Sequence, residues 1–141
     1  MDIKRYLKDI LAEKLFTNKA IVVIGARQIG KTTLLKELLS SYEDTLFVDG
    51  DDRVTRELLQ NPSTEEIKNI IGNHKIVFID EVQRIDTIGI TSKIIVDQFK
   101  EVQLIVSGSS AFDIKNKTSE SLTGRKWEYT MFPITWKELE N

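Results

Sequence analysis

The sequence predicts an α/β domain in which helices cover both faces of a mostly parallel sheet. Short apolar runs rich in β-branched residues, without polar alternation, lie at residues 20–24, 45–48, 75–79 and 102–106, and such runs are typical of strands covered on both faces. Helical patterns separate these runs, so strand and helix alternate. Glycine-containing or acidic segments follow the strands, at the end of the sheet where α/β proteins bind ligands. The 141 residues are enough for one such domain.

An amphipathic helix is predicted over residues 3–16, before the first strand. Its apolar side chains recur at intervals of three and four residues: Ile3, Tyr6, Leu7, Ile10, Leu11 and Leu15. Leucines after residue 33 and isoleucines between residues 88 and 99 predict two more helices. A final apolar stretch at residues 127–132 predicts a fifth strand, followed by a short helix over residues 135–139. The sheet domain is therefore expected over residues 19–141.

The composition excludes several classes of function. Twenty Lys and Arg against twenty-two Asp and Glu leave a formal charge of −2, so no overall field attracts nucleic acid or anionic lipid. The absence of cysteine removes disulfide frameworks, thiolate metal sites and cysteine nucleophiles. No apolar run has membrane-spanning length, and the first residues lack a signal pattern. We therefore expect a cytoplasmic protein with no membrane partner.

A glycine-rich loop directly follows the first predicted strand. It satisfies the pattern G-x-x-x-x-G-K-[ST] at every specified position: Gly25, Ala26, Arg27, Gln28, Ile29, Gly30, Lys31 and Thr32. In such a loop the backbone N–H groups surround a phosphate, and the glycines allow the close approach that a Cβ would block. The following helix points the positive end of its dipole at the phosphates. The loop therefore predicts a nucleotide-binding P-loop domain.

The side chains of this loop predict ATP with Mg²⁺ as the ligand. Lys31 would reach the β- and γ-phosphates, Thr32 would supply a hydroxyl ligand to Mg²⁺, and Thr33 would assist at the α-phosphate. Arg27 and Gln28 either flank the phosphates or contact a neighbouring molecule. Tyr6 is a candidate for contacting the adenine ring, because the predicted helix that contains it directly precedes the first strand.

The strand at residues 75–79 ends in two consecutive carboxylates, Asp80 and Glu81. This is the pattern of a Walker B segment. Asp80 would hold Mg²⁺, and Glu81 would orient and deprotonate the water that attacks the γ-phosphate. Because nucleotide kinases usually lack a general base at this position, Glu81 favours hydrolysis over phosphate transfer to a second substrate.

A polar segment, residues 107–110, follows the fourth strand. Ser109 is the candidate there for holding the attacking water or contacting the γ-phosphate. The alternative is a Ser/Gly turn that caps the next helical segment.

Three other groups of residues are given structural roles. A calcium loop starting at Asp49 would need Gly where Val54 stands, so Asp49, Asp51 and Asp52 are interpreted as strand-end and capping residues. A modest basic cluster has no aromatic side chains alternating with it on which bases could stack, so its charges are interpreted as solvated: Lys115, Lys117, Arg125 and Lys126. Four aromatic residues are interpreted as core: Trp127, Tyr129, Phe132 and Trp136.

Together these segments resemble predicted ATPases of the AAA+ superfamily, found in bacteria and archaea, whose ATPase module precedes a C-terminal domain of unknown function. The similarity rests on residues 25–33, 78–84, 107–110, 122–125 and 132–139. It implies a three-layer P-loop NTPase fold with strand order 5-1-4-3-2. It also implies that Arg125 is a γ-phosphate or partner-site arginine, with a surface or structural role as the alternative.

Members of that family are typically about three times this length. The chain is therefore interpreted as an ATPase core, residues 1–141, that ends before a helical lid and a C-terminal domain. The expected function is Mg-ATP binding, with ATP hydrolysis by the complete form. The alternative is a nucleotide-dependent switch or scaffold whose ATP binding controls a partner. Self-association or a protein partner stays open, and the charge balance does not favour nucleic acid.

Overall fold

The computed structural model describes residues 3–25, 30–109 and 122–131. Within these ranges a single sheet has five strands in the order β2-β3-β4-β1-β5, and every neighbouring pair is parallel. The strands are β1 (Ala20–Gly25), β2 (Thr45–Asp49), β3 (Ile76–Asp80), β4 (Gln103–Gly108) and β5 (Lys126–Met131). Read from the other edge, this is the predicted order 5-1-4-3-2, which is confirmed.

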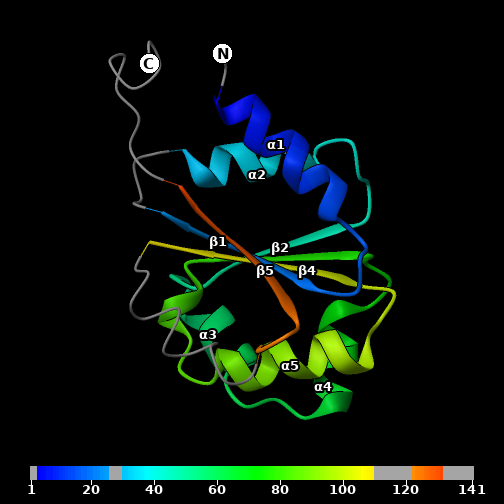
Figure 1. The fold of residues 1–141 in the computed structure, drawn as a ribbon. Coiled ribbons are helices and arrows are strands. Elements are labelled where there is room, and N and C mark those ends of the chain that lie inside the picture. The colour runs from blue at the N-terminus through cyan, green and yellow to red at the C-terminus, as the bar shows by residue number, and fades with distance from the viewer. Residues whose placement is uncertain (1–2, 26–29, 110–121, 132–141) are drawn as a thin grey trace.

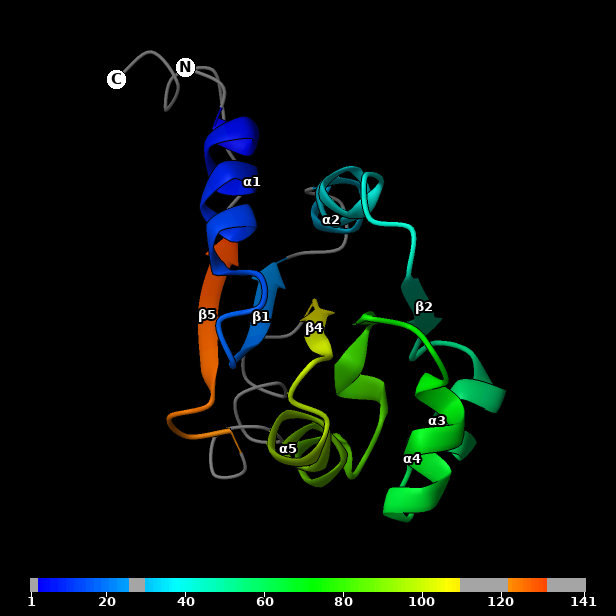
Figure 2. The same cartoon turned by 90° about the vertical axis from the view of Figure 1, so that its right-hand side faces the viewer.

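Helices cover both faces of the sheet, as the alternating pattern predicted (Figure 1). One face carries α1 (Ile3–Lys14) and α2 (Lys31–Leu39). The other carries α3 (Arg53–Leu59), α4 (Thr64–Ile71) and α5 (Ile88–Gln98). Figure 2 shows the three layers, with the sheet between the two groups of helices. A one-turn 3-10 helix, η2 (Val82–Arg84), follows β3.

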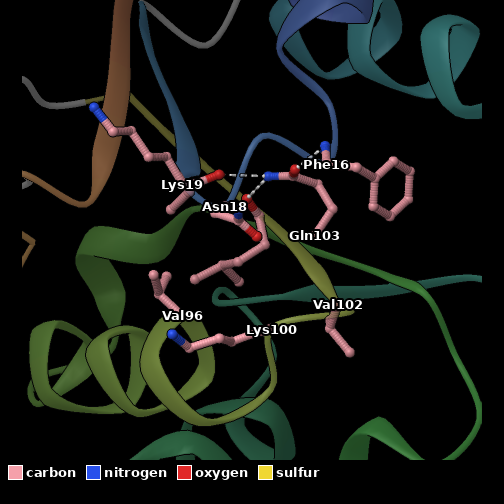
Figure 3. Close-up of a pocket in the computed structure, with 9 residues that line it drawn as sticks. Phe16, Asn18, Lys19, Val96, Lys100, Val102 and Gln103 are labelled. Atoms are coloured by element: carbon pink, nitrogen blue, oxygen red, sulfur yellow. Dashed lines mark hydrogen bonds between the residues drawn. The ribbon is translucent and has the colours of Figure 1, made fainter.

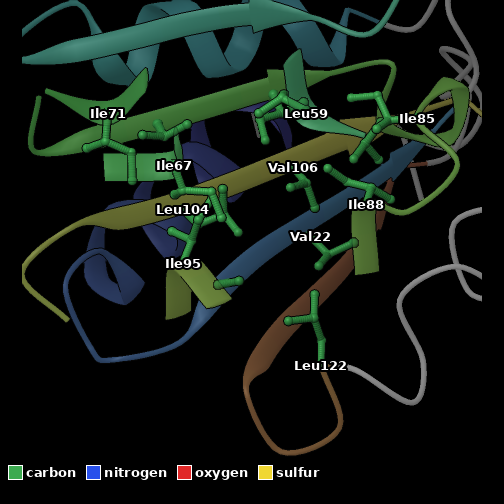
Figure 4. Close-up of a cluster of buried hydrophobic side chains, with 14 of the residues drawn as sticks. Val22, Leu59, Ile67, Ile71, Ile85, Ile88, Ile95, Leu104, Val106 and Leu122 are labelled. Atoms are coloured by element: carbon green, nitrogen blue, oxygen red, sulfur yellow. The ribbon is translucent and has the colours of Figure 1, made fainter. Parts of the chain in front are cut away.

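Two apolar cores explain why the strands show no polar alternation. Val22 and Ile24 of β1 belong to the core under α3, α4 and α5, drawn in Figure 4, whereas Ile21 and Val23 belong to the core under α1 and α2. Because successive strand residues point to opposite faces, a strand that is covered on both faces is apolar at most positions. All six residues of β1 and of β4 are buried.

The structure differs from the sequence-based expectation in three places. Two short helices, α3 and α4, were not predicted, although Ser63 and Glu66 form a complete capping box at the start of α4. The first helix ends at Lys14 rather than residue 16, because Phe16 and Asn18 have positive φ values.

The interpretation of Trp127 as core is also wrong. Its ring is partly exposed on the edge strand β5, where the ammonium groups of Lys14 and Lys19 lie 4.3 and 4.2 Å from the ring centre. Tyr129 does pack against the core under α1 and α2. Phe132, Trp136 and the helix expected over residues 135–139 lie outside the described residues.

Among the residues that the structure describes, no helix is long and apolar enough to cross a membrane.

Candidate nucleotide-binding site

The candidate site lies at the carboxyl ends of β1, β3 and β4. β1 ends at Gly25, and α2 begins at Lys31 after Gly30, whose φ of 85° places it in the left-handed region. Glycine adopts that region without the steric cost of a Cβ, so it suits the last turn of the loop before the helix. Four candidates from the loop lie outside the described residues: Ala26, Arg27, Gln28 and Ile29.

Lys31 occupies the first position of α2, and only 1% of its surface is exposed. Its ammonium nitrogen lies 3.5 Å from Oε1 of Glu81. Glu81 is also buried, with 6% of its surface exposed. A buried lysine needs a compensating charge, because desolvation disfavours its ionised form. The structure thus brings together two sequence-predicted residues that are fifty positions apart.

Asp80 is held by three hydrogen bonds at the end of β3. The hydroxyl of Thr32 donates to its Oδ2 over 2.8 Å, while the hydroxyl of Ser107 and the backbone N–H of Glu81 donate to its Oδ1 over 2.6 and 2.9 Å. Ser107, at the end of β4, is fully buried and was not among the predicted site residues. Its place directly after the apolar run at residues 102–106 was the available signal.

The donor set around Asp80 fits Mg²⁺. Magnesium is usually held by one or two carboxylates together with substrate phosphates and water, and P-loop proteins add a hydroxyl. The Oδ2 of Asp80 and the hydroxyl oxygen of Thr32 are in contact at the start of α2, as such a site requires. No group of three or more His, Cys, Asp or Glu side chains that could hold a metal occurs in the described ranges. Thr33 is exposed on the first turn of α2.

Glu81 has an unusual backbone and two polar neighbours. Its φ of 49° and ψ of 46° lie in the left-handed region, which is uncommon for a residue other than glycine. The side-chain amide of Gln83 donates to its Oε2 over 2.7 Å, and the hydroxyl of Ser109 lies 3.2 Å from the same oxygen. Ser109 therefore lies beside Glu81, and Gln83, which the sequence did not single out, links both residues.

Arg125 is not brought to this site. Its backbone oxygen accepts a hydrogen bond from the N–H of Ala20, the first residue of β1, and its guanidinium Nε lies 2.8 Å from Asp97 on α5. In a parallel sheet the amino ends of all strands lie at one end of the sheet, and their carboxyl ends lie at the opposite end. Arg125 precedes β5, so in the described residues it lies at the end of the sheet opposite the phosphate loop.

Tyr6, the candidate for contacting the adenine ring, is 59% exposed on α1. The carboxylate of Asp49 accepts the N–H of Asp51, which agrees with a turn role. Asp52 occupies the N-cap position of α3, but its side chain accepts from the hydroxyl of Thr55 over 3.2 Å and makes no cap bond to the helix backbone.

A small pocket lies near the amino ends of β1 and β4, where the connection from α1 to β1 contacts the start of β4 (Figure 3). There the side-chain amide of Gln103 accepts from the N–H of Phe16 over 2.6 Å and donates to the oxygen of Lys19 over 2.9 Å. These bonds fasten the α1–β1 connection to the start of β4. The pocket therefore lies away from the phosphate-loop edge.

Comparison with known structures supports the fold. A Walker-type ATPase of Pyrococcus abyssi has a TM-score of 0.64 and 16% identity, and the similarity covers 96% of this chain and 53% of that one. A replication initiator DnaA bound to AMPPCP and single-stranded DNA has a TM-score of 0.60 and 17% identity, over 92% of this chain and 46% of that one. At this level of identity the likeness concerns the fold alone.

Comparison of sequences identifies the family. An uncharacterized protein of Methanocaldococcus jannaschii is 27% identical over 133 residues, which is 89% of this chain and 29% of that protein. The chain thus spans less than a third of this relative and about half of the Pyrococcus ATPase. A family model described as "AAA domain" matches residues 17–140. This match covers most of the sequence, and the chain therefore belongs to the AAA domain family.

Proposed function

We propose that the chain binds ATP with Mg²⁺ and that the complete protein hydrolyses it. The observation that supports this most strongly is the meeting of Lys31, Asp80 and Glu81 at one sheet edge, with Thr32 in contact with Asp80. These four side chains have the types and places needed for binding a terminal phosphate, holding a divalent cation and activating water.

Binding rests on the start of α2. Lys31 would exchange its contact with Glu81 for the phosphate oxygens, which are stronger partners for an ammonium group. Thr32 and Asp80 would hold Mg²⁺, whose charge offsets the negative charge that accumulates on the phosphates during transfer. The N–H groups at the start of α2 add the positive end of a helix dipole.

Hydrolysis rests on Glu81. Its carboxylate would accept a proton from a water molecule as the oxygen of that water attacks the γ-phosphorus. The bond from the γ-phosphorus to the oxygen that bridges the β- and γ-phosphates would break, with ADP as the leaving group and inorganic phosphate as the other product. Gln83 and Ser109 both contact Oε2, so they would fix the direction of the carboxylate without taking the proton themselves. Ser109 would also be near enough to contact the water or the γ-phosphate.

Phosphate release by the longest natural form of the protein tests this proposal. Glu81→Gln keeps the shape of the side chain but cannot accept the proton, so we expect hydrolysis to fall by about 10²- to 10⁴-fold while ATP still binds. Glu57→Gln, the same change at an exposed site on α3, serves as the control and should hydrolyse like the parent. A Glu81→Gln protein as active as the parent would contradict the assignment, and a parent that binds ATP without turnover would favour the switch.

A further inference from the structure

Gly50 follows β2 and is pressed against the peptide that joins Asp80 to Glu81. Its N–H donates to the oxygen of Asp80 over 2.7 Å, and a Cβ added to Gly50 would lie 3.1 Å from that oxygen. The same Cβ would overlap the carbonyl oxygen of Glu81. The backbone of Gly50 lies outside the left-handed region, so glycine is required here for space and not for its φ. Only a residue without a side chain allows Glu81 to keep its position.

That position depends on a strained backbone. A left-handed conformation costs a residue such as Glu81 free energy, and it persists only where the surroundings impose it. On one side, the N–H of Glu81 donates to the side chain of Asp80 over 2.9 Å. On the other, its oxygen faces Gly50 and accepts from the N–H of Arg84 over 3.1 Å. The contacts of Gly50 therefore bear directly on where the carboxylate of Glu81 points.

Arg56 of α3 holds the turn that contains Gly50. Its Nη1 donates to the oxygen of Gly50 over 3.0 Å and to the oxygen of Asp51 over 2.7 Å. The carboxylate of Asp51 in turn lies 3.5 Å from the guanidinium of Arg84, in the 3-10 helix that follows Glu81. A guanidinium that donates to two successive carbonyls fixes the turn more firmly than a single bond would.

We propose that Gly50 and Arg56 are positioning residues for Glu81. The turn between β2 and α3 braces the Asp80–Glu81 peptide, and the brace directs the Glu81 carboxylate toward Lys31. This inference rests on the proposed function, because it assigns the two residues to the hydrolytic step of the same site. Neither residue belongs to the phosphate loop or the Walker B segment, so the effect that we assign to them is on hydrolysis, through the position of Glu81.

Gly50→Ala, made in the longest natural form, tests the contact directly. The added methyl group must displace the backbone of Glu81, and a misplacement of about 1 Å can cost about 10²-fold in rate. We expect kcat for ATP hydrolysis to fall by about that factor, whereas Mg-ATP binds no more than about threefold more weakly than to the parent, a loss below 1 kcal/mol. Gly72→Ala is the matched control, because its methyl group would meet nothing within 4 Å. It should be less stable than the parent, with an unchanged kcat.

Two further sets of variants separate positioning from a merely structural role. Arg56→Ala should lower kcat, and Arg56→Lys, which keeps a donor for the two carbonyls, should restore part of it. Adding Gly50→Ala to Glu81→Gln should cause no further loss, since residues that act through one group are not additive. A folded Gly50→Ala protein with the kcat of the parent would overturn the proposal, as would losses that multiply in the double variant.

A crystal structure of Gly50→Ala gives a readout that does not depend on turnover. We expect the distance between Lys31 Nζ and Glu81 Oε1, 3.5 Å in the parent, to exceed the range of an ion pair. An unchanged distance would overturn the inference even if the proposed hydrolysis holds. Conversely, a parent that fails to hydrolyse ATP contradicts the proposed function alone, and the brace is then judged by this distance.

Discussion

The ammonium group of Lys31 and the carboxylate of Glu81 face each other over 3.5 Å, and both side chains are almost fully buried. Each charge compensates the other in a place that water barely reaches, so the loss of either leaves an uncompensated charge. Nucleotide phosphates would compete with Glu81 for the same ammonium group. The pair therefore couples the residue proposed to bind phosphate to the residue proposed to activate water.

Glu81→Gln should bind Mg-ATP at least as tightly as the parent. The amide removes both the competitor for Lys31 and a negative charge that would repel the phosphates. Without nucleotide the variant should be less stable by up to about 3 kcal/mol, since Lys31 loses its counter-charge. Calorimetric titration and denaturant unfolding, with and without Mg-ATP, measure the two effects. Weaker binding by a folded Glu81→Gln protein would contradict this account.

Asp80→Asn should weaken the dependence of ATP binding on Mg²⁺. The amide is neutral and a poor magnesium ligand, while its oxygen can still accept a hydrogen bond from Thr32. Titration with ATP in Mg²⁺ and then in a chelator should show a smaller difference for the variant than for the parent. Asp97→Asn, at the opposite edge of the sheet, is the control and should behave as the parent. Equal magnesium dependence in Asp80→Asn and the parent would count against Asp80 as a ligand.

Ser63→Ala should destabilise the fold by about 1 kcal/mol through loss of the cap of α4, with no change in ATP affinity.

The hydrogen bond from the backbone of Ser63 lowers the pKa of Glu66 from its ordinary value of 4.5, so the unfolded chain binds the proton more readily. The stabilisation from this pair is thus present above that value and disappears as the pH falls. Urea unfolding of the parent and of Glu66→Gln, which removes the titrating carboxyl, checks this at several pH values, with the exposed Ser40→Ala as control. A stability difference that grows in acid would contradict the sign.

Arg125 should matter for hydrolysis only between molecules. From the separation of Arg125 and the phosphate loop within one chain, we expect residues 1–141 alone to hydrolyse ATP slowly. The rate per molecule should rise with protein concentration or in an extended chain, because an arginine supplied from elsewhere can add about 10³- to 10⁵-fold. Arg125→Ala should cost less than about 1 kcal/mol of stability, because the ion pair with Asp97 is partly exposed. Single-turnover rates across a range of concentrations test this. A fast rate that is independent of concentration and unchanged in Arg125→Ala would contradict it.

The sequence predicted those parts of the fold whose physical signal is local. The buried strands were visible because both faces of the middle layer must be apolar, and the strand order followed from the family resemblance. α3 was missed because seven residues give too short a pattern. Val54 and Leu58 have helical spacing but are exposed, and Leu59 is the one buried apolar residue of this helix. Trp127 was misassigned because an aromatic residue in a strand suggests burial, whereas an edge strand leaves one side open.

The site was predictable to the extent that its residues stand next to strand ends. Lys31, Thr32, Asp80 and Glu81 could be placed because parallel strands bring their carboxyl ends to one edge. Ser107 and Gln83 were missed, since their roles depend on which neighbouring oxygen each side chain reaches. Gly50 was invisible for a similar reason: its requirement comes from a backbone thirty residues away in sequence.

The central claim is that Lys31 binds the terminal phosphates of ATP, and calorimetric titration of Lys31→Ala with Mg-ATP tests it most directly. The variant should lose about 3 kcal/mol of binding free energy, or about a hundredfold in affinity, because charge-assisted hydrogen bonds to phosphate disappear. Lys36→Ala, an exposed lysine on the same helix, should bind like the parent. A folded Lys31→Ala protein that binds Mg-ATP as tightly as the parent would contradict the account.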